Sequence, residues 1–243
     1  AQRAVDTIPG LLQLLENTNE DNFDEEISVL KNWDGRMSTN SVGASLFEVF
    51  FANWTEEVAA ARFPANLVPL MAGASSGLST ELLIKDTNNW FSPGERAKAA
   101  HRAMEKTIDD LSKDAGQDKS KWHWGAIHKV HLHHPLSELG QIFNRLSRGG
   151  QGVGGSGITV SNTGFDPNYL AVMGANYRLV ADLSDDPPGL WAVDAAGQSG
   201  NPGSVNYCDQ LDFWMQNSQH FIPLDRKQVD ENTTNKLIIR RPR

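Results

Sequence analysis

Apolar side chains recur at helical spacing through the first half of the chain. One face of a helix over residues 1–16 would carry Val5, Ile8, Leu11, Leu12 and Leu15. A second stripe follows a short helix and a turn at Asp34-Gly35, and consists of Leu46, Val49, Phe50 and Trp54. Both patterns predict helices that bury one side against a common core.

A third helix is predicted over residues 92–115 by its apolar spacing and by its ends. Ser92 is expected to cap it, Pro93 suits the first helical position, and Glu95 completes a capping box. Gly116 is a natural stop. The apolar stripe consists of Ala97, Ala100, Met104, Ile108 and Leu111.

Short β-prone runs separated by turns replace the helical pattern after about residue 115. The segment KWHWGAIHKVHLHHPL reads as extended, and glycine-rich turns then separate GITVSNTG, NYRLVADL and LWAVDAAG. Helices followed by antiparallel-looking strands predict an α+β fold, mainly helical over residues 1–120 and mainly β over residues 121–243. We expect both segments to belong to one larger domain.

Composition narrows the class of protein. A net charge of −8 over 243 residues argues against nucleic acid or an anionic membrane as the main partner. Cys208 is the only cysteine, which excludes an intrachain disulfide and a cysteine zinc site. No apolar run is long enough to span a membrane. The acidic residues between Glu16 and Glu26 are expected to form a solvated face rather than a calcium loop.

A cluster of five histidines raises the question of a metal. On a strand, His131 and His133 would share one face, and with Glu138 they could hold a metal ion. His128 and His134 would lie on the opposite face, His123 is the fifth histidine of the cluster, and the HExxH spacing is missing. We therefore expect no metal site, and hydrogen-bonded structural histidines instead.

Other short motifs lack the neighbouring secondary structure that their usual function requires. The segment GVGGSG, residues 152–157, matches a dinucleotide-binding pattern, but a β-prone run follows it where a helix is required, so a turn is predicted. Ser75 in GASSG does not lie in a clear strand-to-helix turn. Cys208, beside Asp209 and with His220 downstream, is expected to be inert packing.

Four further motifs occur in an order that resembles the penicillin acylase family of amide hydrolases, from end to end of the chain. The first is WDG before a long helix, and the second is WGxxH, which places Trp124, Gly125 and His128. The third resembles SYRxVxD through Tyr177, Arg178, Val180 and Asp182. The fourth resembles GQSGxPxSxHYxDQ through Gly197, Gln198, Ser199, Gly200, Pro202, Ser204, Tyr207, Asp209 and Gln210. Asn206 and Ser156 depart from the family pattern, where a histidine and an aspartate are usual.

The resemblance implies the fold of N-terminal-nucleophile hydrolases, in which two stacked sheets are flanked by helices in a four-layer αββα sandwich. It also implies a precursor that cuts itself into two subunits, a periplasmic or extracellular bacterial enzyme, and penicillins or N-acyl-homoserine lactones as substrate classes. The new N-terminal serine attacks the amide, with its own α-amine as base. Calcium elsewhere in the enzyme is compatible with the resemblance, whereas no cofactor is expected in this chain.

Ala1 carries no nucleophile, and the family's nucleophile and oxyanion-hole motifs are not found in this sequence. We therefore expect the chain to be the C-terminal part of the large subunit, inactive alone, with its motif residues in structural roles. Its partner would be the remaining acylase polypeptide. Strands cut from a larger sandwich would leave Leu179, Val180, Leu183, Leu190 and Trp191 exposed. The alternative is a non-catalytic fragment or degenerate copy that serves as a structural or binding module.

Overall fold

The computed structural model describes residues 1–16, 23–184, 186 and 188–240. These residues divide into two compact units, 1–174 and 175–243, and each unit is described by itself. The boundary falls later than the change from helices to strands. No helix of the described residues is long and apolar enough to cross a membrane.

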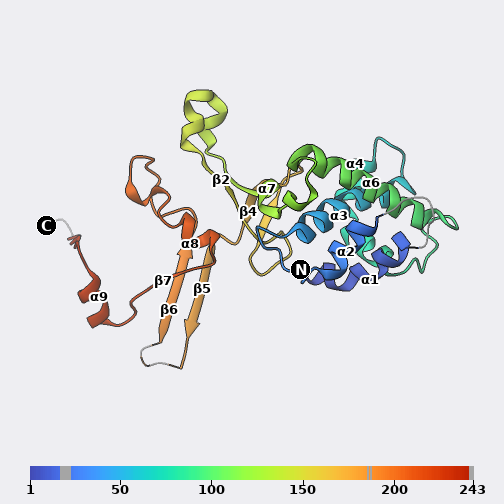
Figure 1. Cartoon of the computed structure of the whole chain (residues 1–243). Helices are drawn as coiled ribbons and strands as arrows, with labels where there is room; N and C mark the ends of the chain where they lie inside the picture. The colour runs from blue at the N-terminus through green and yellow to red at the C-terminus, as the bar shows by residue number, and fades with distance from the viewer. Residues whose placement is uncertain (17–22, 185, 187, 241–243) are drawn as a thin grey trace. The chain divides into compact units, whose positions relative to one another are not determined.

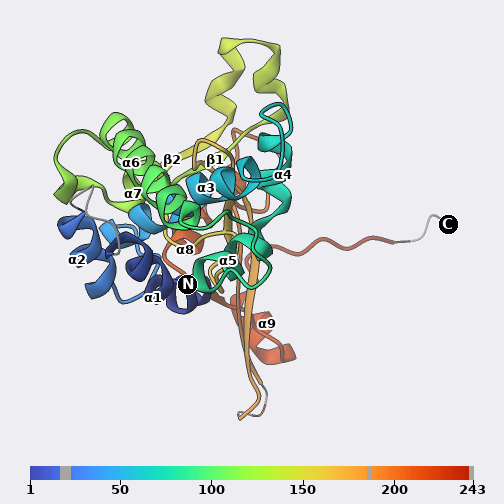
Figure 2. The same cartoon turned by 90° about the vertical axis from the view of Figure 1, so that its right-hand side faces the viewer.

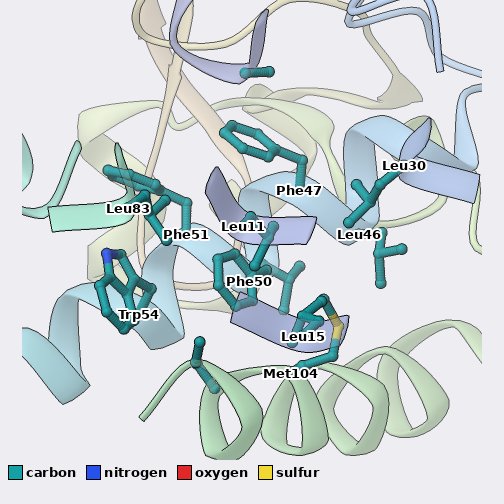
Figure 3. Close-up of a cluster of buried hydrophobic side chains, with 14 of the residues drawn as sticks. Leu11, Leu15, Leu30, Leu46, Phe47, Phe50, Phe51, Trp54, Leu83 and Met104 are labelled. Carbon is teal, nitrogen blue, oxygen red and sulfur yellow. The ribbon is translucent and has the colours of Figure 1, made fainter. Parts of the chain in front are cut away.

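The first unit is built around helix α3 (Val42–Ala60), which is buried on nearly every side. Helices α1 (Gln2–Glu16), α2 (Asp24–Asn32) and α6 (Glu95–Ala115) surround it, together with the shorter α4 (Val68–Ala74) and α5 (Ser76–Ile84). Figure 3 shows the apolar core where α1, α3, α5 and α6 meet, with Phe50 and Leu15 facing Met104. The predicted apolar stripes of α1 and α3 are thereby confirmed at Leu11, Leu15, Leu46 and Trp54, whereas Val5 is exposed.

Close backbone contact holds α1 against α5. A Cβ atom on Gly10 would lie only 2.1 Å from the carbonyl oxygen of Leu83, so no larger residue fits at this crossing. The indole of Trp54 donates a hydrogen bond to the carbonyl of Ser79 at 2.8 Å, and so ties α3 to α5. The core is therefore fixed by specific contacts as well as by apolar burial.

Two details of the helical half differ from the sequence prediction. Helix α6 begins at Glu95 rather than near Ser92, because Gly94 precedes it with φ of 79° in the left-handed region. The acidic face is not wholly solvated, since Glu26 is only 3% exposed and accepts a hydrogen bond from Lys119. Glu20 and Asp21 lie outside the described residues. The predicted stop at Gly116 is confirmed.

A small mixed sheet completes the first unit. Its strand order is β2-β1-β4-β3, with β1 (Lys129–Leu132) parallel to β4 (Ala171–Gly174) and antiparallel to β2 (Arg148–Gly152), while β3 (Thr163–Phe165) pairs antiparallel with β4. Between β1 and β2 the short 3-10 helices η2 (Pro135–Leu139) and η3 (Gln141–Leu146) project beyond the strands, as Figure 2 shows. Another, η1 (Lys119–Lys121), follows α6 and leads to α7 (Trp124–Ile127).

The extended segment predicted around Trp124 is only partly correct. Residues 124–127 form one turn of helix, because the N–H groups of Trp124 and Gly125 bond the carbonyls of Ser41 and Thr39 and hold the chain against the start of α3. The strand begins only at Lys129. Residues 157–161, within the β-prone run GITVSNTG, form a turn and bends rather than a strand.

The second unit contains an antiparallel sheet of order β5-β6-β7. Strands β5 (Tyr177–Asp182) and β6 (Gly189–Asp194), which fall in two of the predicted β-prone runs, pair in a continuous antiparallel register, and β7 (His220–Phe221) pairs with β6 (Figure 1). After β6 the chain forms a loop, residues 195–210, that contains the 3-10 helix η4 (Val205–Tyr207) and leads into α8 (Leu211–Met215). Helix α9 (Arg226–Asn232) follows β7.

Candidate functional site

Residues 195–210, called the signature loop from here on, fold back tightly on themselves. The N–H of Ser199 donates to the carbonyl of Asn206 at 3.0 Å, and the N–H of Gln210 donates to the carbonyl of Ala196 at 3.0 Å. A Cβ atom on Gly197 would lie 2.4 Å from the Asn206 oxygen, so the glycine is required by this close approach. Gly200 has open space around it and carries no such requirement.

Residues of the signature loop, together with residues of β5, β6 and β7, line a groove of about 460 Å³. Four motif residues named from the sequence line this signature-loop groove, namely Tyr177, Gln198, Asp209 and Gln210, and the remaining lining residues are Ala192, Val193, Asp194, His220 and Ile222. Segments that are apart in sequence thus meet at one surface. The grouping of these four residues supports the interpretation that the third and fourth motifs form one structural feature.

Asp194, at the end of β6, organises the polar side of the groove. Its carboxylate accepts hydrogen bonds from the amides of Gln198 at 2.7 Å and Asn176 at 3.2 Å, while its N–H donates to the side-chain oxygen of Gln210 at 2.9 Å. The two motif glutamines therefore anchor the loop to the strand. Sequence reasoning missed Asp194, which stands three residues before the GQSG motif. Because side chains alternate between the two faces of a strand, the pattern along β6 could have shown that Asp194 shares a face with Ala192.

The groove has the chemistry of a binding surface rather than of a nucleophile. Its polar lining consists of two carboxylates, two carboxamides, a phenol and the imidazole of His220, with no serine, threonine, cysteine or lysine. The Nε2 atom of His220 is buried and has no hydrogen-bond partner in the structure. Such a surface can accept and orient hydrogen-bond donors, but it contains no side chain that could attack an amide in the usual way.

Arg178 and Asp182, two further motif residues of β5, have structural contacts. Arg178 donates to the carbonyl of Trp214 at 2.8 Å and stacks over its indole at 4.4 Å, so it fixes α8 to the sheet; burial lowers its pKa. Asp182 accepts the Ser184 N–H at 2.9 Å and hydroxyl at 2.6 Å, and these bonds hold its pKa below the ordinary value. Within the signature loop, the Ser204 hydroxyl caps η4 by accepting the N–H of Asn206.

The WGxxH motif forms a separate buried cluster in the first unit. The indole of Trp124 donates to the carbonyl of Gly155 at 2.8 Å and stacks on His128 with ring centroids 4.4 Å apart. His128 is fully buried, and its Nδ1 donates to the carbonyl of Tyr169 at 2.8 Å while its Nε2 faces the Thr163 hydroxyl at 3.1 Å. Burial lowers the pKa of His128 to about 4. His128 is therefore neutral, and its hydrogen bond with Thr163 links the α7 turn to β3.

Gly125 and the GVGGSG segment complete the same cluster. A Cβ on Gly125 would lie 3.1 Å from Thr39, and one on Gly154 would lie 2.7 Å from the carbonyl oxygen of Met37. Gly155 has a φ of 89°. Turns and strand β3 come directly after the segment instead of a helix, so the prediction of a turn rather than a nucleotide loop is confirmed.

The other histidines are spread over several short elements. The rings of His131 and His133 stack at 5.7 Å, and His133 Nε2 lies 3.1 Å from the Ser137 hydroxyl and 3.8 Å from Glu138. The hydroxyl also lies 3.3 Å from His133 Nδ1 and donates to the His134 carbonyl, and Glu138 is beyond hydrogen-bond distance of the ring, so this is not the relay of a catalytic triad. Nowhere in the described ranges do three or more His, Cys, Asp or Glu side chains come together as a metal would require. His123 precedes α7.

Residues 1–231 match the family model described as penicillin amidase. The chain is similar to the acyl-homoserine lactone acylase QuiP of Pseudomonas putida, with 26% identity over 93% of this chain and 28% of the relative. It is also similar to the penicillin acylase 2 proenzyme of Pseudomonas sp., with 27% identity over 75% of this chain and 24% of the relative. The chain thus spans less than a third of these curated relatives.

The solved structure of a thermostable penicillin G acylase from Alcaligenes faecalis superposes on 99% of this chain and 47% of its own, with a TM-score of 0.59 and 14% identity. This likeness defines the class: the chain has the α+β fold of N-terminal-nucleophile hydrolases. Within that class, the match over residues 1–231 shows that the chain belongs to the penicillin amidase family.

Proposed function

We propose that this chain is part of an acylase that hydrolyses the amide bond between an acyl group and an amine. The observation that carries the proposal is the family match over residues 1–231, together with relatives named as acyl-homoserine lactone and penicillin acylases. Penicillins and N-acyl-homoserine lactones are accordingly the proposed substrate classes.

The proposed nucleophile is an N-terminal serine on a polypeptide segment outside this sequence. Its hydroxyl oxygen would attack the amide carbon and pass its proton to the serine's own α-amine, which would then protonate the leaving amine. Water would release the acyl group from the resulting ester. The α-amine of an internal serine is part of a peptide bond, and the lining of the signature-loop groove includes no serine, threonine, cysteine or lysine, so this chain is proposed to be inactive alone.

The remaining acylase polypeptide is proposed to be the partner of this chain. A precursor that cuts itself into a heterodimer, and a periplasmic or extracellular location, follow from the family resemblance. No cofactor is proposed for this chain, and calcium would belong to other parts of the enzyme. The motif residues Trp124, Gly125 and His128 are proposed to be structural, in keeping with their buried contacts.

Intact mass measurement and N-terminal sequencing of the natively produced protein, combined with an amide-hydrolysis assay, test this proposal. We expect a companion polypeptide that begins with serine and a preparation that releases amine from a phenylacetyl or fatty-acyl anilide. A native protein without such a companion and without hydrolysis would favour the non-catalytic module instead.

A further inference from the structure

A pocket of about 230 Å³, called the α2 pocket from here on, lies in the first unit between α2, the start of α3 and the segment that follows α6. Its apolar lining consists of Val29, Val42, Leu46 and Trp122. The indole N–H of Trp122 already donates to the carbonyl of Gly116 at 2.7 Å, so the ring contributes apolar surface. An apolar cavity of ~150 Å³ holds benzene, and the α2 pocket therefore has room for a phenyl ring with a short arm.

Charged side chains form the polar part of the α2 pocket. Lys119 donates hydrogen bonds to Glu25 at 2.9 Å and to Glu26 at 2.5 Å. The bond with Glu26 raises the pKa of Lys119, which keeps the ammonium charged. Two carboxylates and one ammonium leave one net negative charge beside the apolar lining. The pocket thus combines a place for an apolar group with an attraction for a cation.

Glu26 is the most deeply placed of these charged groups. The residue is 3% exposed, whereas the side chain of Glu25 is 64% exposed. Within the part of the chain that the structure describes, Lys119 provides the only hydrogen bond to the Glu26 carboxylate. A carboxylate has about four acceptor sites, so Glu26 can receive further donors from a molecule in the pocket. Hydrogen bonds between charged groups are about twice as strong as those between neutral groups, which favours an ammonium donor.

We propose that the α2 pocket binds a small organic amine. The apolar body of the ligand would lie against Leu46 and Trp122, while its ammonium group would donate to Glu26. An alcohol of the same shape would lack the attraction to the net negative charge, and a carboxylate would be repelled by it. This inference does not depend on the proposed acylase activity, because none of these residues belongs to the four motifs that resemble the family.

Fluorine NMR of the natively produced protein, labelled with fluorotryptophan, tests the proposal with benzylamine, benzyl alcohol and benzoate as matched probes. The signal of Trp122 is assigned with Trp122→Phe. We expect benzylamine to shift this signal in a saturable manner at neutral pH, benzyl alcohol to bind about tenfold or more weakly, and benzoate not to bind. No saturable shift with benzylamine, or binding of either other probe as tight as that of benzylamine, would overturn the proposal.

Three substitutions separate the α2 pocket from binding of the amine elsewhere. Glu26→Gln keeps the shape of the side chain but removes its charge, and should weaken benzylamine binding about tenfold or more. Glu56→Gln, on α3 but outside the pocket, is the matched control and should bind benzylamine as the natural chain does. Val29→Phe retains both carboxylates and fills the pocket with a ring, so it should abolish binding. Undiminished binding by Val29→Phe, or by a Glu26→Gln protein with a natural circular dichroism spectrum, would refute the proposal.

Discussion

The buried histidine of the WGxxH motif makes the stability of the first unit depend on pH. The pKa of His128 is lowered from 6.5 to about 4 because burial disfavours the charged ring. The unfolded chain therefore binds more protons than the folded chain between these values. His128 contributes its full stability above pH 6.5 and loses it progressively as the pH falls toward 4.

The size of the effect follows from the two pKa values. At about 1.4 kcal/mol per pKa unit, the full loss is about 3.4 kcal/mol, and between pH 7 and pH 5 the loss is about 2 kcal/mol. A typical domain has ~5–15 kcal/mol in total, so the change is well within measurement. Because His128 is fully buried, solvent screening does not reduce this figure much.

Urea unfolding of the chain at pH 7, 6 and 5 measures this dependence. His128→Gln removes the titrating group, so the free energy of unfolding should fall less steeply as the pH falls from 7 to 5. The variant itself is expected to be less stable than the natural chain. His131→Gln, at an exposed histidine of β1, is the matched control and should keep the slope of the natural chain. Equal slopes in all three proteins, or an NMR titration of the His128 ring centred near pH 6.5, would refute the reasoning.

Three further predictions concern the other features. Gly197→Ala should destabilise the second unit by about 1–3 kcal/mol in urea unfolding, because the added Cβ would lie too close to the Asn206 carbonyl. Gly200→Ala, at a position with open space, should change the midpoint of urea unfolding little. Equal effects of the two substitutions would contradict the loop geometry. The histidine cluster should retain no zinc after dialysis against a mild chelator, and stoichiometric zinc by elemental analysis that is lost in a His131→Ala/His133→Ala variant would overturn this. The chain alone should bind a hydrophobic dye because apolar side chains of β5 are exposed, and a compact monomer in size-exclusion chromatography that binds no dye would count against that.

Much of the helical architecture could be predicted from sequence because it depends on local periodicity. The apolar spacing of α1 and α3 and the stop at Gly116 each reflect interactions within a few residues. The start of α6 was misplaced because Ser92 and Gly94 both suit a helix start, and only the backbone geometry at Gly94 decides between them. The turn of helix at Trp124 depends on bonds to Thr39 and Ser41, which lie more than 80 residues earlier and leave no local signal.

The candidate site shows the same limit. The motifs include Gln198 and Gln210, but the residue that both contact, Asp194, stands outside the motif pattern. Glu26 was misjudged for the same reason, because its partner Lys119 comes from a distant part of the chain. Sequence pattern identified which segments matter, while the contacts between them required the folded chain.

Amide hydrolysis by matched preparations tests the central claim most directly. This chain alone, the remaining acylase polypeptide alone and the two produced together would each be assayed at equal concentration with a phenylacetyl anilide and a fatty-acyl anilide. The account predicts turnover only when both polypeptides are present, and loss of that turnover when the N-terminal serine of the companion is replaced by alanine. Turnover by this chain alone, or full turnover by the companion without it, would contradict the account.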